Sequence, residues 1–171
     1  MKKVIYEAFG NPADVLRVVE EPSAALKPGE LRVSVLRAPI NPSDLIQIAG
    51  EYGVKPALPA VAGNEGIGRV VEGDGLPMGQ LVLLPAGQGT WVSEVTAPAN
   101  QFIPLPEGDV DQLSMLLVNP ATAVLLLDEF VSLKPGDWVI QSAANSGVGG
   151  YVVQLCKARG INLVNVVRRE R

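Results

Sequence analysis

The sequence predicts a mixed fold, in which an all-β N-terminal domain is followed by the opening βαβ unit of a doubly wound α/β domain. Within residues 1–108, short apolar runs are separated by turn residues, a pattern typical of a small barrel-like β domain. From residue 109 onward, helix and strand patterns alternate, which indicates a parallel sheet. We therefore predict a β domain at 1–108 and, at 109–171, linker helices followed by the first part of the α/β domain.

The β domain is predicted from strand patterns that follow one another at short intervals. Leu31, Val33 and Val35 alternate with polar residues, which is the period of a half-buried strand. A Lys-Pro-Gly-Glu turn at 27–30 precedes this strand. Further strand patterns lie at 68–72, 81–84 and 91–96.

Two helices are expected between the β domain and the first parallel strand. Asp111 is a suitable N-cap for a helix that begins at Gln112. Pro120 is acceptable at the first position of a second helix, over 121–130. A Lys-Pro-Gly-Asp turn at 134–137 then leads into a strand.

The stretch from 138 to 168 is the most informative part of the chain. It contains a strand at 138–141, a turn of small residues at 142–150, a helix at 151–160 and an apolar strand at 161–167. Small residues allow the backbone to approach a pyrophosphate at a helix N-terminus, where free N–H groups favour an anion. This order predicts a Rossmann dinucleotide-binding unit, with Asn145 in place of the usual first glycine. The alternative is a plain strand–helix turn.

The end of the second strand indicates which cofactor binds. An acidic residue there would bind the ribose 2′-hydroxyl of NAD, whereas arginine suits the 2′-phosphate of NADP. The chain has Arg168 and Arg169, and a guanidinium group matches phosphate geometry. We therefore predict NADPH as the cofactor. The alternative is a solvated charged tail.

Composition excludes several classes of protein. The net charge of −4 argues against nucleic acid as the main partner, and no apolar run is long enough to span a membrane. The chain has no histidine and one cysteine, so a zinc site would need carboxylates alone, and we predict no metal. Cys156 is expected to be a packed core thiol. With no recognisable leader and no possible internal disulfide, the prediction is a cytoplasmic protein.

Tyr52 lies in a polar segment, 41–52, of a domain otherwise composed for packing. It falls between two glycines, in an expected loop. A loop tyrosine can donate a proton if its hydroxyl reaches a substrate. From spacing alone, an aromatic plug in a turn is favoured.

The chain ends just beyond the second strand of the predicted parallel sheet. A doubly wound domain usually has about six strands. Two strands and one helix would leave a sheet edge and a sheet face uncovered. We therefore expect a fragment of a longer enzyme, or completion of the sheet by something else, and a homodimer formed through the nucleotide domain.

The β domain and three motifs along the chain resemble the medium-chain dehydrogenase/reductase superfamily. The motifs are Gly-Asn-Glu-Gly at 63–66, Asn-Pro-Ala-Thr-Ala at 119–123 and Ala-Asn-Ser-Gly-Val-Gly at 144–149. The resemblance implies a GroES-like β domain. Zinc members carry Gly-His-Glu at the position of 63–65 and a cysteine near 41–42, and both ligands are missing here. The chain therefore resembles the zinc-free branch.

Within that branch, the chain is similar to the 2-enoyl thioester reductases of the mitochondrial enoyl-CoA/ACP reductase type. The similarity rests on 41–44 with 50–53, on 145–149 and on 165–168, and extends over essentially the whole chain. It implies a full length of roughly twice this chain. It also implies NADPH-dependent reduction of trans-2-enoyl-CoA or acyl-carrier-protein thioesters in fatty acid synthesis.

The resemblance also implies roles for individual residues. Tyr52 matches the loop tyrosine that donates the proton or holds the enolate oxygen, and Asn119 matches a cofactor-contacting asparagine. Arg168 matches the 2′-phosphate ligand, with Arg169 beside it. The pyrophosphate turn is matched by Asn145, Ser146, Gly147 and Val148. Two alternatives stay open: a zinc-free quinone or alkenal oxidoreductase, and a non-catalytic remnant that binds nucleotide or a partner.

Overall fold

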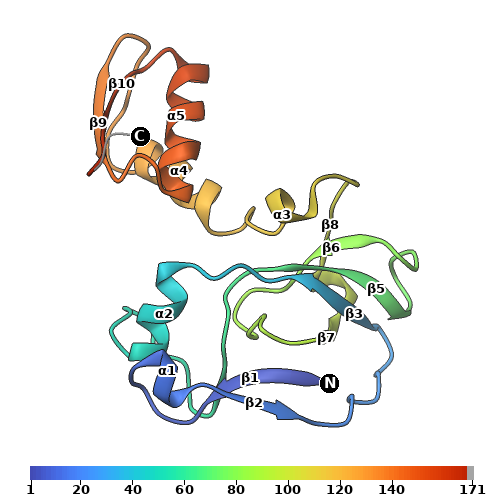
Figure 1. Cartoon of the computed structure of the whole chain (residues 1–171). Helices are drawn as coiled ribbons and strands as arrows, with labels where there is room; N and C mark the ends of the chain where they lie inside the picture. Colours follow the sequence, from blue (N-terminus) through green and yellow to red (C-terminus); the bar gives the residue numbers. More distant parts are fainter. Residues whose placement is uncertain (169–171) are drawn as a thin grey trace. The chain divides into compact units, whose positions relative to one another are not determined.

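The computed structural model describes residues 1–168, and Figure 1 shows its elements in order along the chain. The chain forms two compact units, Met1–Met115 and a second that begins at Leu116. Each unit has its own apolar core, so each is described separately.

The first unit contains two antiparallel sheets. One is three-stranded, in the order β2-β1-β4, and the other is five-stranded, in the order β7-β3-β5-β6-β8. Burial alternates from residue to residue in the first half of β3, where Leu31 and Val33 are fully buried. The strands are β1 (Lys2–Tyr6), β2 (Arg17–Glu20), β3 (Glu30–Arg37), β4 (Ala60–Val61), β5 (Ile67–Gly73), β6 (Leu81–Leu83), β7 (Glu94–Pro98) and β8 (Ile103–Pro104).

Short helices connect the strands of the first unit. The longest, α2 (Pro42–Ala49), has proline in its first turn and ends at Gly50, whose positive φ of 79° suits glycine. Two apolar clusters stabilise the unit: one lies within the five-stranded sheet around Leu31 and Phe102, and the other joins Tyr6 to Ile48 of α2. The remaining helices are α1 (Pro12–Val15), η1 (Ala99–Gln101) and α3 (Val110–Leu113).

The second unit contains a parallel strand pair and two helices (Figure 1). Strand β9 pairs with β10 in parallel, with Val139 opposite Leu163. Both of these residues pack against a buried cluster in which Ala123 of α4 meets Val152 and Cys156 of α5. The elements are α4 (Asn119–Asp128), β9 (Trp138–Ser142), α5 (Gly147–Arg159) and β10 (Asn162–Val166).

The predicted fold class is confirmed, and the helix starts need correction. The cap of α3 is Asp109, whose carboxylate accepts from the N–H groups of Asp111 and Gln112, so Asp111 itself lies inside the helix. Helix α5 begins at Gly147, four residues earlier than predicted, because the side chain of Ser146 caps it within the glycine turn. The small residues are therefore part of the first helical turn.

Candidate functional site

The turn between β9 and α5 brings backbone N–H groups to the C-terminal end of the strand pair. Ala143 adopts a positive φ of 51°, and Ser146 N–H donates to its carbonyl oxygen at 2.9 Å. The Ser146 hydroxyl accepts from Gly149 N–H at 3.1 Å and so caps the helix. The N–H groups of a helix start that have no partner within the helix favour an anion.

Close packing explains two of the glycines in this turn. A Cβ on Gly149 would lie 2.6 Å from the carbonyl oxygen of Ala144, which is closer than real Cβ atoms come. A Cβ on Gly147 would lie 3.2 Å from the side chain of Asn119, at the start of α4. This short distance places Asn119, which is itself buried, directly against the turn. A Cβ on Gly150, in contrast, would meet nothing within 4 Å.

Gln141 connects three parts of the second unit. Its side-chain amide donates to Asn165 Oδ1 at 2.7 Å and to the carbonyl oxygen of Gly149 at 3.2 Å. The first bond joins the neighbouring strands, and the second joins β9 to the first turn of α5. This side chain therefore links the strand that precedes Arg168 to the helix N-terminus.

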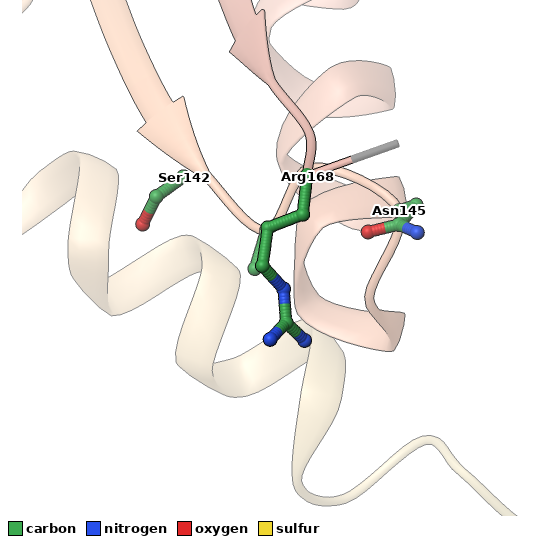
Figure 2. Close-up of a pocket in the computed structure, with 4 residues that line it drawn as sticks. Ser142, Asn145 and Arg168 are labelled. Carbon is green, nitrogen blue, oxygen red and sulfur yellow. The ribbon is translucent and has the colours of Figure 1, made fainter. Parts of the chain in front are cut away.

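A pocket opens at this end of the strand pair (Figure 2). It is lined by Ser142, Ala143, Asn145 and Arg168. Within residues 1–168, no acidic side chain forms a salt bridge with Arg168. The pocket therefore combines a guanidinium group with a capped helix start, a combination suited to a phosphorylated ligand.

The predicted cofactor residues that the structure describes lie in the second unit, in or beside the turn between β9 and α5. Asn145 and Ser146 lie in the turn, Gly147 and Val148 open α5, and Asn119 lies against Gly147. Val148 is partly buried and packs against the apolar core. Arg169 lies outside the described residues. Ser142 and Ala143 lie within the turn predicted at 142–150 but were not named as cofactor residues, and in the structure Ser142 is the last residue of β9.

Tyr52 belongs to the first unit, so its place relative to the pocket is not defined. It lies in the loop after α2, and its side chain is 44% exposed. This exposure leaves the phenol accessible to a substrate and does not suit an aromatic plug. The loop is joined to α2 by a hydrogen bond from Glu51 N–H to the carbonyl oxygen of Ile46, and Lys55 lies over the ring of Phe9.

A buried polar network lies at the other end of α2, and sequence reasoning missed it. Asp44 is 1% exposed, and both of its oxygens accept hydrogen bonds, one from Asn64 Nδ2 at 2.7 Å and one from Asn41 N–H at 2.6 Å. Asn41 Nδ2 also donates to Glu65 Oε1 at 2.8 Å. Burial raises the pKa of Asp44, although the hydrogen bonds from Asn41 and Asn64 act in the opposite direction. The sequence signals were the polar segment at 41–52 and the polar pair in the motif at 63–66.

Three other features of the described residues concern the single cysteine, metal binding and membrane spanning. Cys156 is 1% exposed within the α4–α5 cluster, and burial raises the pKa of its thiol, so the prediction of a packed core residue is confirmed. Among residues 1–168, no group of three or more His, Cys, Asp or Glu side chains is placed to hold a metal ion. In the same part of the chain, none of the helices has the length and apolar character needed to cross a bilayer.

Known proteins match this chain along nearly all of its length. The alcohol dehydrogenase GroES-like domain matches residues 27–107. The mitochondrial enoyl-[acyl-carrier-protein] reductase of Xenopus tropicalis is 42% identical over 171 residues, which cover 96% of this chain and 49% of that protein. A structure of Etr1p with NADP and crotonyl-CoA is 31% identical, with a TM-score of 0.86, and the match covers 99% of this chain and 54% of that one.

A quinone oxidoreductase also matches. The enzyme from Thermus thermophilus, solved alone and with NADPH, is 25% identical with a TM-score of 0.82, and the match covers 99% of this chain and 54% of that one. The present chain thus spans about half the length of the relatives it matches.

The prediction of a cytoplasmic protein is wrong. The enoyl reductases that this chain matches, from vertebrates to Arabidopsis thaliana, are named as mitochondrial proteins. The prediction depended on the single cysteine and on the lack of a recognisable leader, and neither observation is specific to the cytoplasm.

Proposed function

Since this chain belongs to the medium-chain dehydrogenase/reductase superfamily and is of its enoyl thioester reductase type, we propose that the whole protein reduces trans-2-enoyl thioesters with NADPH. The family prediction made from the motifs is confirmed. The observation that carries the proposal is the pocket of the second unit, where Arg168 lies beside the turn that opens α5. Similarity to Etr1p, which has been solved with NADP and crotonyl-CoA, supports both the cofactor and the substrate class.

The residues of the second unit fit a phosphorylated dinucleotide. The turn at 145–148 would hold the pyrophosphate through backbone N–H groups, with Gly149 allowing the tight turn that places them. Asn119 would contact the cofactor beside Gly147, and Arg168 would bind the 2′-phosphate. When bound, the reduced nicotinamide supplies a hydride for the β-carbon of the enoyl thioester.

Tyr52 would act on the substrate from the first unit. Its Oη–H would donate a hydrogen bond to the thioester oxygen, or supply the proton that the α-carbon gains as the double bond is reduced. A donor placed where negative charge develops lowers the barrier without a metal ion. The exposed position of the phenol supports this role.

A zinc-free quinone oxidoreductase is the second candidate, favoured by the match to the Thermus thermophilus enzyme. The two functions share the cofactor site and differ in the electron acceptor. In the full-length protein, we expect NADPH oxidation with crotonyl-CoA and little with a simple quinone. Efficient quinone reduction without enoyl reduction would contradict the proposal. NADPH binding without turnover of either acceptor would indicate the non-catalytic alternative.

We also propose that the whole protein forms a homodimer through its nucleotide domain. The mitochondrial 2-enoyl thioester reductase Etr1p/Etr2p heterodimer from Candida tropicalis, whose structure is 32% identical to this chain with a TM-score of 0.87, supports pairing of two such subunits. Analytical ultracentrifugation of the full-length protein should give the mass of a dimer, and a monomer at micromolar concentration would contradict this proposal.

A further inference from the structure

The network around Asp44 fixes the N-terminal end of α2 to the loop at 63–66. Asn64 and the backbone of Asn41 each donate to one oxygen of Asp44, and Asn41 is bonded in turn to the fully buried Glu65. A buried carboxylate that loses a donor is costly, because it cannot exchange that donor for water. The network therefore strongly favours one position of this helix end.

The other end of α2 is fixed by separate contacts. Glu51 N–H donates to the carbonyl oxygen of Ile46 at 3.0 Å, and Gly10 N–H donates to that of Ile48 at 3.1 Å. Phe9 packs so closely on Gly50 that a Cβ there would lie 2.8 Å from the Cβ of Phe9. The loop that carries Tyr52 therefore leaves the helix from a defined point, two residues before the tyrosine.

We propose that Asp44 and Asn64 are positioning residues for Tyr52. Their hydrogen bond sets where α2 lies, and α2 sets where the phenol lies. If this hydrogen bond is lost, α2 can tilt about the contacts of Gly10 and Phe9 at its C-terminal end, and the tilt turns the direction in which the tyrosine loop leaves the helix. A displacement of the phenol by about 1 Å can cost roughly 10²-fold in rate. This inference rests on the proposed function, in which Tyr52 acts on the substrate.

A double-mutant cycle in the full-length protein tests the inference. Asn64→Leu removes the donor at similar volume, and Asp44→Asn removes the charge. Each should lower kcat with crotonyl-CoA by about ten- to a hundredfold. The KM for NADPH should stay near that of the wild type, because the nucleotide turn belongs to the other unit. In a Tyr52→Phe background, neither substitution should lower kcat much further, since both act through the phenol.

Thr90→Val is the matched structural control. It removes another buried hydrogen bond of the same loop, from Thr90 Oγ1 to the Glu65 carbonyl oxygen at 2.7 Å, without touching α2. It should lower Tm and leave kcat close to that of the wild type. If Asn64→Leu does not fold, Asp44→Asn alone completes the cycle.

Three outcomes would overturn the inference. If Asn64→Leu or Asp44→Asn lowers kcat by the same factor in the Tyr52→Phe background as in the wild type, Asp44 and Asn64 act independently of the phenol. An equal loss of kcat in Thr90→Val would show a merely structural role. Full turnover in Tyr52→Phe alone would remove the proposed role of Tyr52 itself but would leave the proposed function standing, because only a wild-type protein that does not reduce crotonyl-CoA counts against that function.

Discussion

Strands β3 and β6 of the first unit are more deeply buried than β9 and β10 of the second. All three residues of β6 are buried, as are Leu31 and Val33 of β3. In β9, by contrast, Trp138 and Ile140 are each 71% exposed, whereas Val139 between them packs against the helices. Strands with apolar residues on both faces are typical of parallel sheets covered on both sides.

This difference extends to how each unit holds its candidate site residues. In the first unit, we infer that the position of Tyr52 depends on residues outside its own loop, namely α2 and the buried network around Asp44. In the second, the pocket depends on local backbone geometry: the positive φ of Ala143, the Ser146 cap and the tight approach of Gly149. We therefore expect substitutions around Tyr52 to affect turnover, and substitutions around the pocket to affect cofactor binding.

The largest expected effect is on turnover, at Tyr52. In the full-length protein, Tyr52→Phe should lower kcat by about 10²–10⁴, the usual contribution of a positioned proton donor. The Kd for NADPH, measured by fluorescence titration, should stay near that of the wild type. Val54→Ala, at an exposed position of the same loop, is the control and should change neither quantity. Unchanged turnover in Tyr52→Phe would mean that the tyrosine only packs.

At the pocket, Arg168→Ala should weaken NADPH and spare NADH. A hydrogen bond to a charged group is worth about 1.5–3 kcal/mol, so the Kd for NADPH should rise roughly ten- to a hundredfold. Arg159→Ala is the matched control, because Arg159 pairs with Asp128 at the far end of α5 and exposed ion pairs contribute little. Equal losses for the two cofactors would exclude a contact between Arg168 and the 2′-phosphate.

Features of the fold and of the site were predictable from the sequence where the residues that cause them lie close together in the chain. The strand–turn–helix unit at 138–160 was predictable because small residues and apolar runs lie within one short segment, although the Ser146 cap and the early start of the helix were not predicted. The network of Asp44 and Asn64 was not, because the partners are 20 residues apart and meet only after α2 has folded against the loop at 63–66. The cap of α3 was misplaced by two residues, since Asp109 and Asp111 are equally good caps by composition.

Two neighbouring glycines of α5 provide a comparison within the second unit. Gly149→Ala places a methyl group against the backbone of Ala144, and overpacking of this kind costs about 1–3 kcal/mol. Gly150→Ala meets nothing within 4 Å and should stabilise the helix by roughly 0.5–1 kcal/mol. Chemical denaturation of the two variants measures the difference. Equal destabilisation would mean that the turn does not impose the tight approach at Gly149.

Metal removal should have the smallest effect. The buried carboxylates of Asp44 in α2 and of Glu65 already have hydrogen-bond donors within the protein. Both oxygens of Asp44 and Oε1 of Glu65 accept hydrogen bonds from N–H groups of Asn41 and Asn64. A metal ion would have to break these buried bonds, and amide nitrogens are not zinc ligands. Elemental analysis of the full-length protein should therefore find no stoichiometric zinc, and EDTA should leave kcat unchanged. A zinc-dependent dehydrogenase treated in parallel should lose its activity. One zinc per chain, with activity lost on chelation, would mean that the first unit relies on a metal where the structure shows hydrogen bonds.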